Sequence, residues 1–296
     1  MKRLNDTTVS EGFGASIQTG PHDVDSWVFV AYDQLNLSLI ETIEQTIGTV
    51  GLVFIESAFK GRSRPYHKQK LALLLSNQRH FALEAQQAGY AIDYLVTRGT
   101  YAETLGVLSK DLGPIHCVAF AEYSTRIELQ PLIESGALVV HPHSGWLTPR
   151  SWFTETVGTA PPFRMDRFYR RVRKETGWLM VDAQPVGDKY SFDEENRKPW
   201  RGDPHAPTPP TFRADDVDLD VKKMVEHVYS DHPGSIDFTQ IPTSKADIEA
   251  SMEFARSCLT HFGTYEDAMS TESRGLFHTR LASLLNLHRV MPHQAA

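Results

Sequence analysis

The stretch WVFVAYDQLNLSLIETIEQTIGTVGLVFI, residues 27–55, decides the fold of this chain of 296 residues. It opens with the apolar run 27–32, which is typical of a strand buried on both faces. Apolar residues then recur at helical spacing as far as Gly48, and Asn36 or Ser38 can cap this helix. A second apolar run, 51–55, follows. A strand, a helix and a second strand of these lengths predict a βαβ unit with a right-handed crossover.

The same alternation continues to about residue 141. We predict three further strands at residues 91–96, 116–121 and 137–141, and three further helices at residues 66–87, 100–113 and 124–135. Five strands alternating with four helices predict an α/β domain with a five-stranded, mostly parallel, Rossmann-like sheet.

Outside this domain the chain changes character. Residues 1–26 lack an apolar core and a small-residue cleavage site, so we expect a flexible leader and no signal peptide. The α/β domain is expected at 27–145, and residues 146–214 are expected to form a connection that includes a proline-rich stretch. Residues 215–296 are expected to form a helical segment, with helices at 215–229, 244–261 and 278–290.

Composition limits the classes of function. The fractions of hydrophobic residues (41%) and charged residues (23%) are those of an ordinary globular protein, and no apolar run approaches the roughly 20 residues of a membrane helix. We therefore expect no membrane partner. The formal charge of −7 argues against a nucleic-acid-binding surface over most of the chain. Cys117 and Cys258 are expected to be buried thiols in a reducing compartment, which indicates a cytoplasmic protein.

Polar residues gather where the predicted strands end. Asp33, Gln34 and Leu35 follow the first strand, Glu56 follows the second and Glu122 the fourth. Open parallel sheets bind ligands outside the carboxyl ends of their strands, so these residues are candidates for a binding site. The alternative is that the carboxylates only cap helices and bond to loops. The first turn lacks the G-x-G-x-x-G pattern of a dinucleotide site, and the chain has no Walker-type G-x-x-x-x-G-K.

Other chemistry has little support in the sequence. His141 and His143 are the closest histidine pair, but no third ligand lies nearby in sequence, so we expect no metal site. Arg79 and His80, on the predicted long helix, are expected to form a surface or interdomain pair. No nucleophile elbow is present, and neither cysteine has an activating setting, so we name no catalytic residue.

The segment 164–174 is the most basic part of the chain. Its apolar residues predict a helix that packs against something. Its arginines could contact phosphates, or they could pair within the protein. We favour internal pairing, because the acidic residues Asp193, Glu194 and Glu195 follow only about 20 residues later.

Several motifs resemble the bacterial cryptochrome/photolyase-related family that carries an iron–sulfur cluster. The most specific is MDRFYRRVRK (165–174), followed by GWLM (177–180) and QPVGDKYSFDEENRKP (184–199). Shorter matches are DQL (33–35), HKQK (67–70), RHF (79–81) and FGTYEDAM (262–269). The resemblance runs from about Trp27 to the end of the chain.

The resemblance implies an α/β antenna domain joined to an all-helical domain that binds FAD. It implies light-driven repair of (6-4) pyrimidine lesions in DNA, with the lesion flipped out of the duplex. In this family the antenna domain holds 6,7-dimethyl-8-ribityllumazine, and Asp33, Gln34, Leu35 and Glu56 fall on that site. HTRLASLLNLHRVMP (278–292) resembles the flavin-phosphate motif, which assigns Thr279 and Asn286 to a partial FAD site.

The chain also departs from the family. Relatives of this type are considerably longer, so we expect only the first helices of an incomplete FAD-binding domain here. FAD is then doubtful, and no iron–sulfur cluster is expected, because two cysteines cannot hold one. Ala282 replaces a family serine of the flavin motif, and Tyr32 stands where the family has glycine, which is expected to crowd the antenna pocket.

These departures leave three functions open. The chain could be a truncated photolyase-related protein, inactive alone and unlikely to bind damaged DNA, which depends on a separate C-terminal half. It could be a stand-alone lumazine- or flavin-binding module. It could also be a partner-docking scaffold, since the leucines of 281–287 are expected to expose an apolar stripe.

Overall fold

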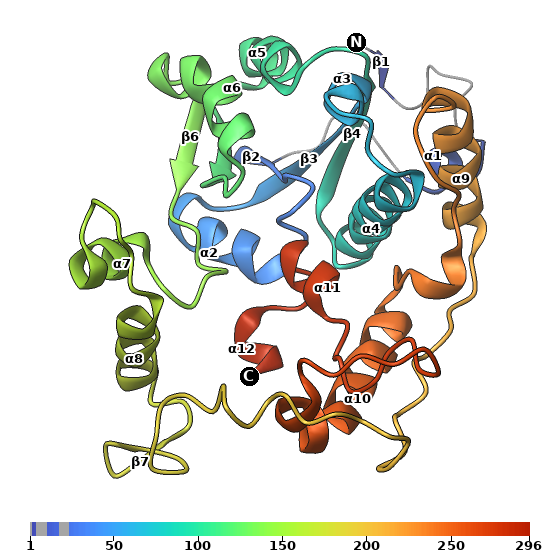
Figure 1. Ribbon diagram of the computed structural model, residues 1–296. Coiled ribbons are helices and arrows are strands. Elements are labelled where there is room, and N and C mark those ends of the chain that lie inside the picture. Colours follow the sequence, from blue (N-terminus) through green and yellow to red (C-terminus); the bar gives the residue numbers. More distant parts are fainter. Residues whose placement is uncertain (1, 4–10, 18–23) are drawn as a thin grey trace. The chain divides into compact units, whose positions relative to one another are not determined.

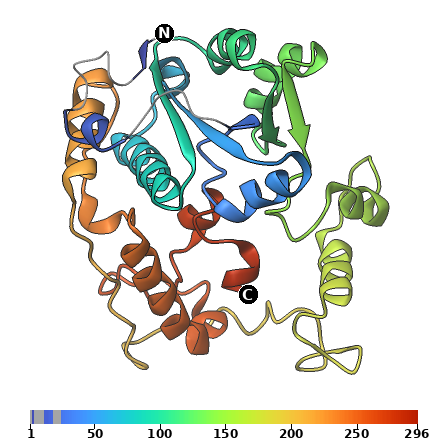
Figure 2. The same ribbon diagram turned by 180° about the vertical axis from the view of Figure 1, so that it is seen from behind.

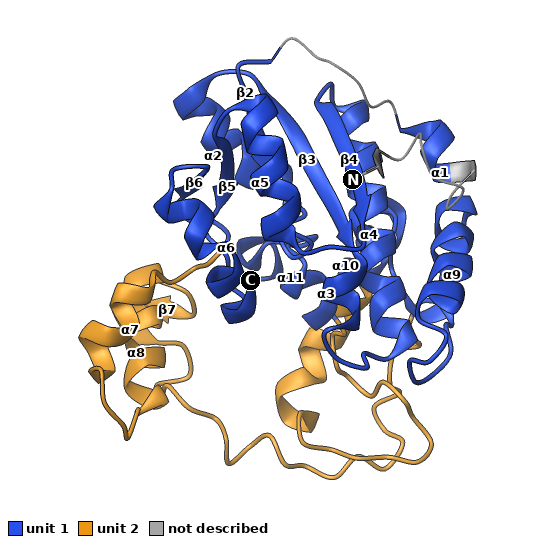
Figure 3. Ribbon diagram, turned by 90° about the horizontal axis from the view of Figure 1, so that it is seen from above, with its two compact units in different colours: residues 1–145, 210–252, 281–296 blue, residues 146–209, 253–280 orange. Residues whose placement is uncertain are grey.

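The computed structural model describes residues 2–3, 11–17 and 24–296. The chain divides into two compact units, which Figure 3 colours separately. The first unit comprises residues 1–145, 210–252 and 281–296, and the second comprises residues 146–209 and 253–280. The expected helical segment 215–296 contributes residues to both units, and the domain boundaries expected from the sequence stay a prediction.

The first unit is built on a six-stranded sheet with the order β1-β4-β3-β2-β5-β6. Strands β2 to β6 pair in parallel, whereas β1 pairs antiparallel with β4. This arrangement confirms the predicted α/β fold with a five-stranded parallel, Rossmann-like sheet. The strands are β1 (Lys2–Arg3), β2 (Ser26–Phe29), β3 (Val50–Ser57), β4 (Ala91–Thr97), β5 (Ile115–Val118) and β6 (Leu138–His141).

The strand order reverses at β2. The chain proceeds from β2 to β3 and β4 on one side, and then returns to β5 on the other side of β2. In register, Phe29 of β2 lies between Val53 of β3 and Cys117 of β5. The carboxyl ends of these three strands therefore meet at a topological switch point, which is where open α/β sheets bind ligands.

Helices cover both faces of this sheet, as Figure 1 and Figure 2 show. Because side chains alternate along a strand, Leu52 and Phe54 of β3 pack with α2 and α4, whereas Val53 and Ile55 pack with α5 and α6. Two hydrophobic cores result, one on each face. The helices are α2 (Leu37–Ile47), α3 (Ala58–Arg62), α4 (Lys68–Gln87), α5 (Tyr101–Leu112) and α6 (Tyr123–Glu134).

Part of the expected leader is structured. Within residues 1–26, the described residues form β1 and the helix α1 (Glu11–Ser16). Phe13 and Ile17 are buried in the core, and the Phe13 ring packs edge-on against Tyr94 at 4.9 Å between centroids. The four-residue spacing of Phe13 and Ile17 was the signal for a helix, but a single pair in a short segment is weak. Residues 1, 4–10 and 18–23 of the expected leader lie outside the described residues.

The C-terminal segments of the first unit pack on its α/β core. The helix α9 (Asp216–Val228) lies against α4, and Val221 and Val225 share a core with Leu71. After the short helix α11 (Ala282–Asn286), Leu287 enters the core beneath the sheet, and Leu284 is also buried. Leu281 is buried as well and Leu285 is half-buried, so the expected exposed leucine stripe at 281–287 is wrong. The remaining elements are the 3₁₀ turn η2 (Phe238–Gln240) and the helix α12 (Pro292–Ala295).

The second unit is smaller and has a core of its own, formed by Ala206, Phe254, Cys258, Tyr265, Leu276 and Phe277. Its elements are α7 (Arg150–Val157), α8 (Met165–Thr176), β7 (Met180–Val181), β8 (Gln184–Pro185) and the 3₁₀ turn η3 (Gly263–Tyr265). The helix α10 (Lys245–Phe262) contributes residues 245–252 to the first unit and 253–262 to the second. Among the described residues, no helix is long and apolar enough to cross a membrane.

The basic segment forms α8, as predicted, but its arginines have other partners than expected. Arg171 pairs with Glu155 of α7 at 2.7 Å, and the buried Arg173 donates hydrogen bonds to the backbone carbonyls of Trp178 and Tyr190. The pairing of these arginines with residues 193–195 is therefore wrong. The backbone after the helix turns back on Gly177, which has a φ of +72°, and brings carbonyl groups close enough to accept from Arg173.

We predict that Phe13→Ala lowers the free energy of unfolding by about 3 kcal/mol, because it removes a fully buried ring. Chemical denaturation of the purified protein measures this loss. Ala15→Ser, at an exposed position of the same helix, is the control and should leave stability within about 0.5 kcal/mol. Equal stability of Phe13→Ala and the native chain would show that residues 11–17 do not belong to the folded core.

Candidate functional site

A cavity of about 550 Å³ lies in the first unit, at the carboxyl ends of β2, β3 and β5. Its size is in the ordinary range of about 300–1,000 Å³ for small-molecule sites. It is lined by Tyr32, Asp33, Ile55, Glu56, Ser57, Lys60, Gly61, Tyr66, Lys70, Leu71, Leu73, Leu74, Leu75, Gln78, Tyr101, Ala121, Glu122, Tyr229, Ser283, Asn286 and Leu287. The cavity thus occupies the switch point of the sheet, with α4, the end of α9 and α11 as its other walls.

The walls are mainly aromatic and aliphatic. Four tyrosines contribute to the lining, and the leucines of α4 form one continuous apolar wall. The ammonium group of Lys70 lies 4.8 Å from the centre of the Tyr66 ring, within reach of a cation–π contact. Such walls suit a flat, partly apolar ring system, because aromatic side chains provide large contact surfaces and polar edges.

Asp33 supplies an unusual carboxyl group to the cavity. Burial and, to a smaller extent, the negative charge of Glu122 raise its pKa to about 6, although a backbone hydrogen bond and the charge of Lys60 oppose this shift. The same setting raises the pKa values of the neighbouring Tyr32 and Tyr101 hydroxyls. A carboxyl group with a pKa near 6 changes its charge close to physiological pH, and such groups are characteristic of functional sites.

Glu122 is held in place by several hydrogen bonds. Its carboxylate accepts from Lys60 at 2.6 Å, from Thr125 at 2.6 Å, from Ser124 at 2.7 Å and from the Tyr32 hydroxyl at 3.1 Å. Although burial raises the pKa of Glu122, these hydrogen bonds hold it at about 2. Lys60 and Glu122 therefore form a fixed pair of opposite charges at the wall of the cavity.

Glu56 lines the cavity, but its oxygens are already occupied. Both accept from the Arg79 guanidinium, at 2.6 and 3.0 Å, and one also accepts from the Tyr94 hydroxyl at 2.6 Å. Arg79 is fully buried, so the predicted surface or interdomain pair of Arg79 and His80 is wrong for this residue. Glu56 therefore joins β3 to α4 and β4, and it forms part of the cavity wall.

Some of the site residues predicted from the sequence line the cavity, and others do not. Asp33, Glu56 and Glu122 line the cavity, and Asn286 joins them there. Gln34 and Leu35 do not belong to the lining. The Gln34 amide donates to the backbone carbonyls of Val118 and Ala119, and the buried Leu35 donates its N–H to the carbonyl of Leu287 at 2.9 Å. The half-buried Thr279 belongs to the second unit.

Sequence reasoning missed several lining residues, chiefly Lys60, Tyr66, Lys70, Tyr229 and Ser283. Lys70 lies within the HKQK motif, and Lys60 follows the N-cap Ser57, whose hydroxyl accepts from the Lys60 N–H at 3.0 Å. The motif and the cap were therefore the available signals. Tyr229 and Ser283 come from distant parts of the chain, and no local pattern connects them with the sheet.

Comparison with known proteins shows the family of the chain. The family described as deoxyribodipyrimidine photo-lyase-related protein matches residues 28–240. A protein of Agrobacterium fabrum named (6-4) photolyase is 30% identical over 275 residues, which is 88% of this chain and 53% of that protein. The chain thus spans about half the length of this curated relative. Because the family match covers most of the chain, including strands β3 to β6 and all the lining residues before Ser283, the chain belongs to the deoxyribodipyrimidine photo-lyase-related protein family.

Proposed function

We propose that the cavity at the switch point binds a light-absorbing chromophore, so that this chain provides the antenna part of a photolyase-related protein. The observation that carries the proposal is the cavity of about 550 Å³, with aromatic walls, at the carboxyl ends of β2, β3 and β5. Membership of the photo-lyase-related family supports a photolyase-like function for the chain, and we propose that a chromophore bound in this cavity serves it.

The first candidate is 6,7-dimethyl-8-ribityllumazine, and the lining fits its two chemical parts. Tyr66, Tyr101 and the leucines of α4 would hold the flat ring system. Asp33, Ser283 and Asn286 would accept from or donate to the hydroxyls of the ribityl chain. When bound, the lumazine would supply absorption of violet light and transfer of the excitation. Tyr32 lines the cavity where the family has glycine, and the remaining volume still suits a ligand of this size.

The second candidate is a flavin in the same cavity. Asn286 comes from the segment that resembles the flavin-phosphate motif, and it lies in the lining together with Ser283. Thr279, the other residue assigned to that motif, belongs to the second unit. Only Asn286 of the two assigned residues lines the cavity, which favours lumazine over FAD there.

Repair of (6-4) lesions is proposed only for a complete protein of this family. The relative named (6-4) photolyase supports this reaction, and the chain matches about half of that protein. We propose that this chain does not repair DNA alone, and that FAD and damaged DNA are bound with a further C-terminal part, in the cytoplasm. We also propose that this chain holds no iron–sulfur cluster, because it has only two cysteines.

We predict that purified protein, freed of small molecules and titrated with ribityllumazine, binds one equivalent and shifts the absorption and fluorescence of the ligand. Leu74→Trp should weaken binding at least about tenfold, because the larger ring fills the cavity from α4. Gln87→Trp, at an exposed position of the same helix, is the matched control and should bind normally. Tighter binding of riboflavin or FMN than of lumazine would favour the second candidate, and no binding of either would refute the proposal.

Asp33→Asn gives a second prediction, in which stability and binding change in opposite directions. The pKa of Asp33 is raised from 3.8 to about 6, so the folded protein loses stability as the pH rises through this range. Asparagine avoids the buried charge. The variant should therefore gain up to about 3 kcal/mol above pH 6 and nothing below about pH 4.

Lumazine binding to the native chain should tighten as the pH rises past about 6, since only the ionised carboxylate accepts two ribityl hydroxyls. In Asp33→Asn, affinity should fall about tenfold or more at pH 8, and its pH dependence should disappear. Denaturation and ligand titration at pH 4, 6 and 8, chosen as roughly spanning that change, measure both effects. A variant that gains stability but binds normally would show that Asp33 does not contact the ligand.

A further inference from the structure

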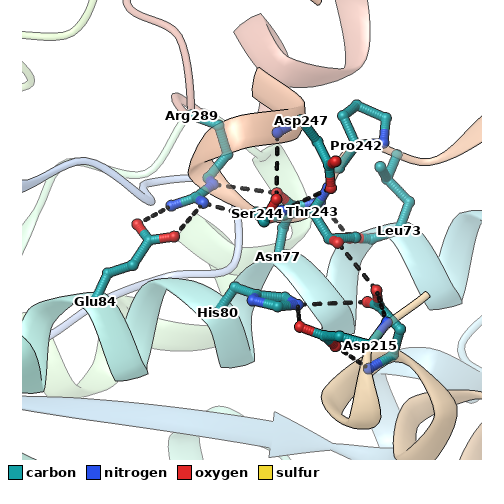
Figure 4. Close-up of polar contacts among 11 residues, drawn as sticks. Leu73, Asn77, His80, Glu84, Asp215, Pro242, Thr243, Ser244, Asp247 and Arg289 are labelled. Atoms are coloured by element: carbon teal, nitrogen blue, oxygen red, sulfur yellow. Dashed lines mark hydrogen bonds and ion pairs between the residues drawn. The ribbon is translucent and has the colours of Figure 1, made fainter. Parts of the chain in front are cut away.

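A second group of polar residues lies outside the cavity, between α4 and the start of α9. His80 of α4 faces Asp215 and Asp218, and its Nε2 atom is 3.5 Å from Asp215 Oδ2 and 3.5 Å from Asp218 Oδ1 (Figure 4). One possible ligand atom from each of the three side chains lies within 4.8 Å of the other two. His80 and Asp218 are buried, with 8% and 2% of their surface exposed, whereas Asp215 is exposed to solvent.

A capping box orients the two carboxylates. Asp215 Oδ1 accepts from the backbone N–H of Asp218 at 3.0 Å, and Asp218 Oδ2 accepts from the backbone N–H of Asp215 at 3.2 Å. The Thr243 hydroxyl also donates to Asp218 Oδ2, at 3.1 Å. Each aspartate thus uses one oxygen to hold the helix start, and turns the other toward His80. Outer contacts of this kind orient the ligands of metal sites.

The two contacts of His80 Nε2 are longer than ordinary hydrogen bonds. A charge-assisted N–H···O bond is about 2.7–2.9 Å long, and both contacts of His80 Nε2 are considerably longer. Neither His80 Nε2 nor Asp218 Oδ1 has a hydrogen-bond partner among the described residues, although both atoms are buried. Buried polar atoms are rarely left in this state. Nitrogen and oxygen ligands arranged tetrahedrally at Zn–ligand distances of about 2.0–2.2 Å lie about 3.3–3.6 Å apart, and the two distances of 3.5 Å from His80 Nε2 fall in this range.

We propose that His80, Asp215 and Asp218 bind a divalent metal ion of the zinc class. One imidazole and two carboxylates are ligands that Zn²⁺ accepts, and an imidazole disfavours Mg²⁺ and Ca²⁺, which prefer oxygen. The fourth position faces solvent beside the exposed Asp215 and would hold water. The N-terminal dipole of α9 opposes a cation with only about half an elementary charge, whereas the two carboxylates supply two negative charges.

The role of this site is structural. Among the described residues that line the cavity, none belongs to this group. A metal ion would join α4 to the start of α9, and Tyr229, which follows the last residue of α9, lines the cavity. The ion would therefore hold a wall of the cavity in position. Because the ligands come from positions 80, 215 and 218, the spacing of histidines in the sequence does not reveal them.

The test is a Zn²⁺ titration of the whole chain after removal of metal with a chelator, with a coloured zinc indicator as competitor. We expect one tight site per chain and a higher melting temperature with zinc, because an ion that binds only the folded state stabilises it. Co²⁺ in place of Zn²⁺ should give the absorption bands of a four-coordinate ion. His80→Asn and Asp218→Asn should weaken zinc binding at least about 100-fold, since changing even an outer contact costs about 10–100-fold.

One further ligand variant and one control variant complete the test. Asp215→Asn retains an oxygen that caps α9, so it should keep the metal-free melting temperature and lose the rise caused by zinc. His141→Asn is the control at a histidine outside the proposed site, where His116 Nδ1 lies 2.8 Å from His141 Nε2. This variant should leave the tight zinc site unchanged. The proposal fails if the native chain has no saturable zinc site, if His80→Asn and Asp215→Asn bind zinc as tightly as the native chain, or if His141→Asn abolishes the site. Any of these results would leave an ion pair only.

Discussion

The buried pair of Arg79 and Glu56 is the interaction on which the first unit depends. Arg79 is fully buried, and its two hydrogen bonds to Glu56 join α4 to β3, while the Tyr94 hydroxyl adds β4. The ring of Phe13 covers the guanidinium, with 5.0 Å between Arg79 Cζ and the ring centre. Removing either charge would leave the other buried and unpaired, which costs about 3–5 kcal/mol. The pair therefore holds four elements in one arrangement.

This pair also decides which carboxylate remains available in the cavity. Glu56 and Glu122 both line the cavity, but their oxygens are engaged by Arg79 and by Lys60, respectively. Asp33 has no such cationic hydrogen-bond donor among its described contacts, and burial raises its pKa. A cavity and a buried carboxyl group both reduce stability. The surrounding fixed pairs offset this cost, and the cavity can therefore remain open in a folded protein.

The sequence was sufficient for the five parallel strands and for the edge at which the cavity lies, because apolar runs and helical spacing are local patterns, but not for β1. The sequence did not predict which of the side chains that follow the strand ends would line the cavity. Asp33 points into the cavity, whereas Gln34 and Leu35 bond elsewhere. The interpretation of Arg79 as a surface residue followed the usual exposure of arginine, and its burial depends on Glu56, 23 residues away. Similarly, His80 meets its aspartates only because α9 packs on α4.

The helix α4 connects these features, because three sets of its residues at helical spacing face three different neighbours. Residues 70, 71, 73, 74, 75 and 78 line the cavity, Arg79 bonds to the sheet, and residues 77, 80 and 84 face α9 and the C-terminal segment. In the last set, Asn77 and Glu84 both bond to the buried Arg289, as Figure 4 shows. A ligand in the cavity and an ion at His80 would therefore contact the same packed helix. If binding at one site shifts the position of α4, it changes the affinity of the other site, and this coupling is reciprocal by thermodynamic necessity.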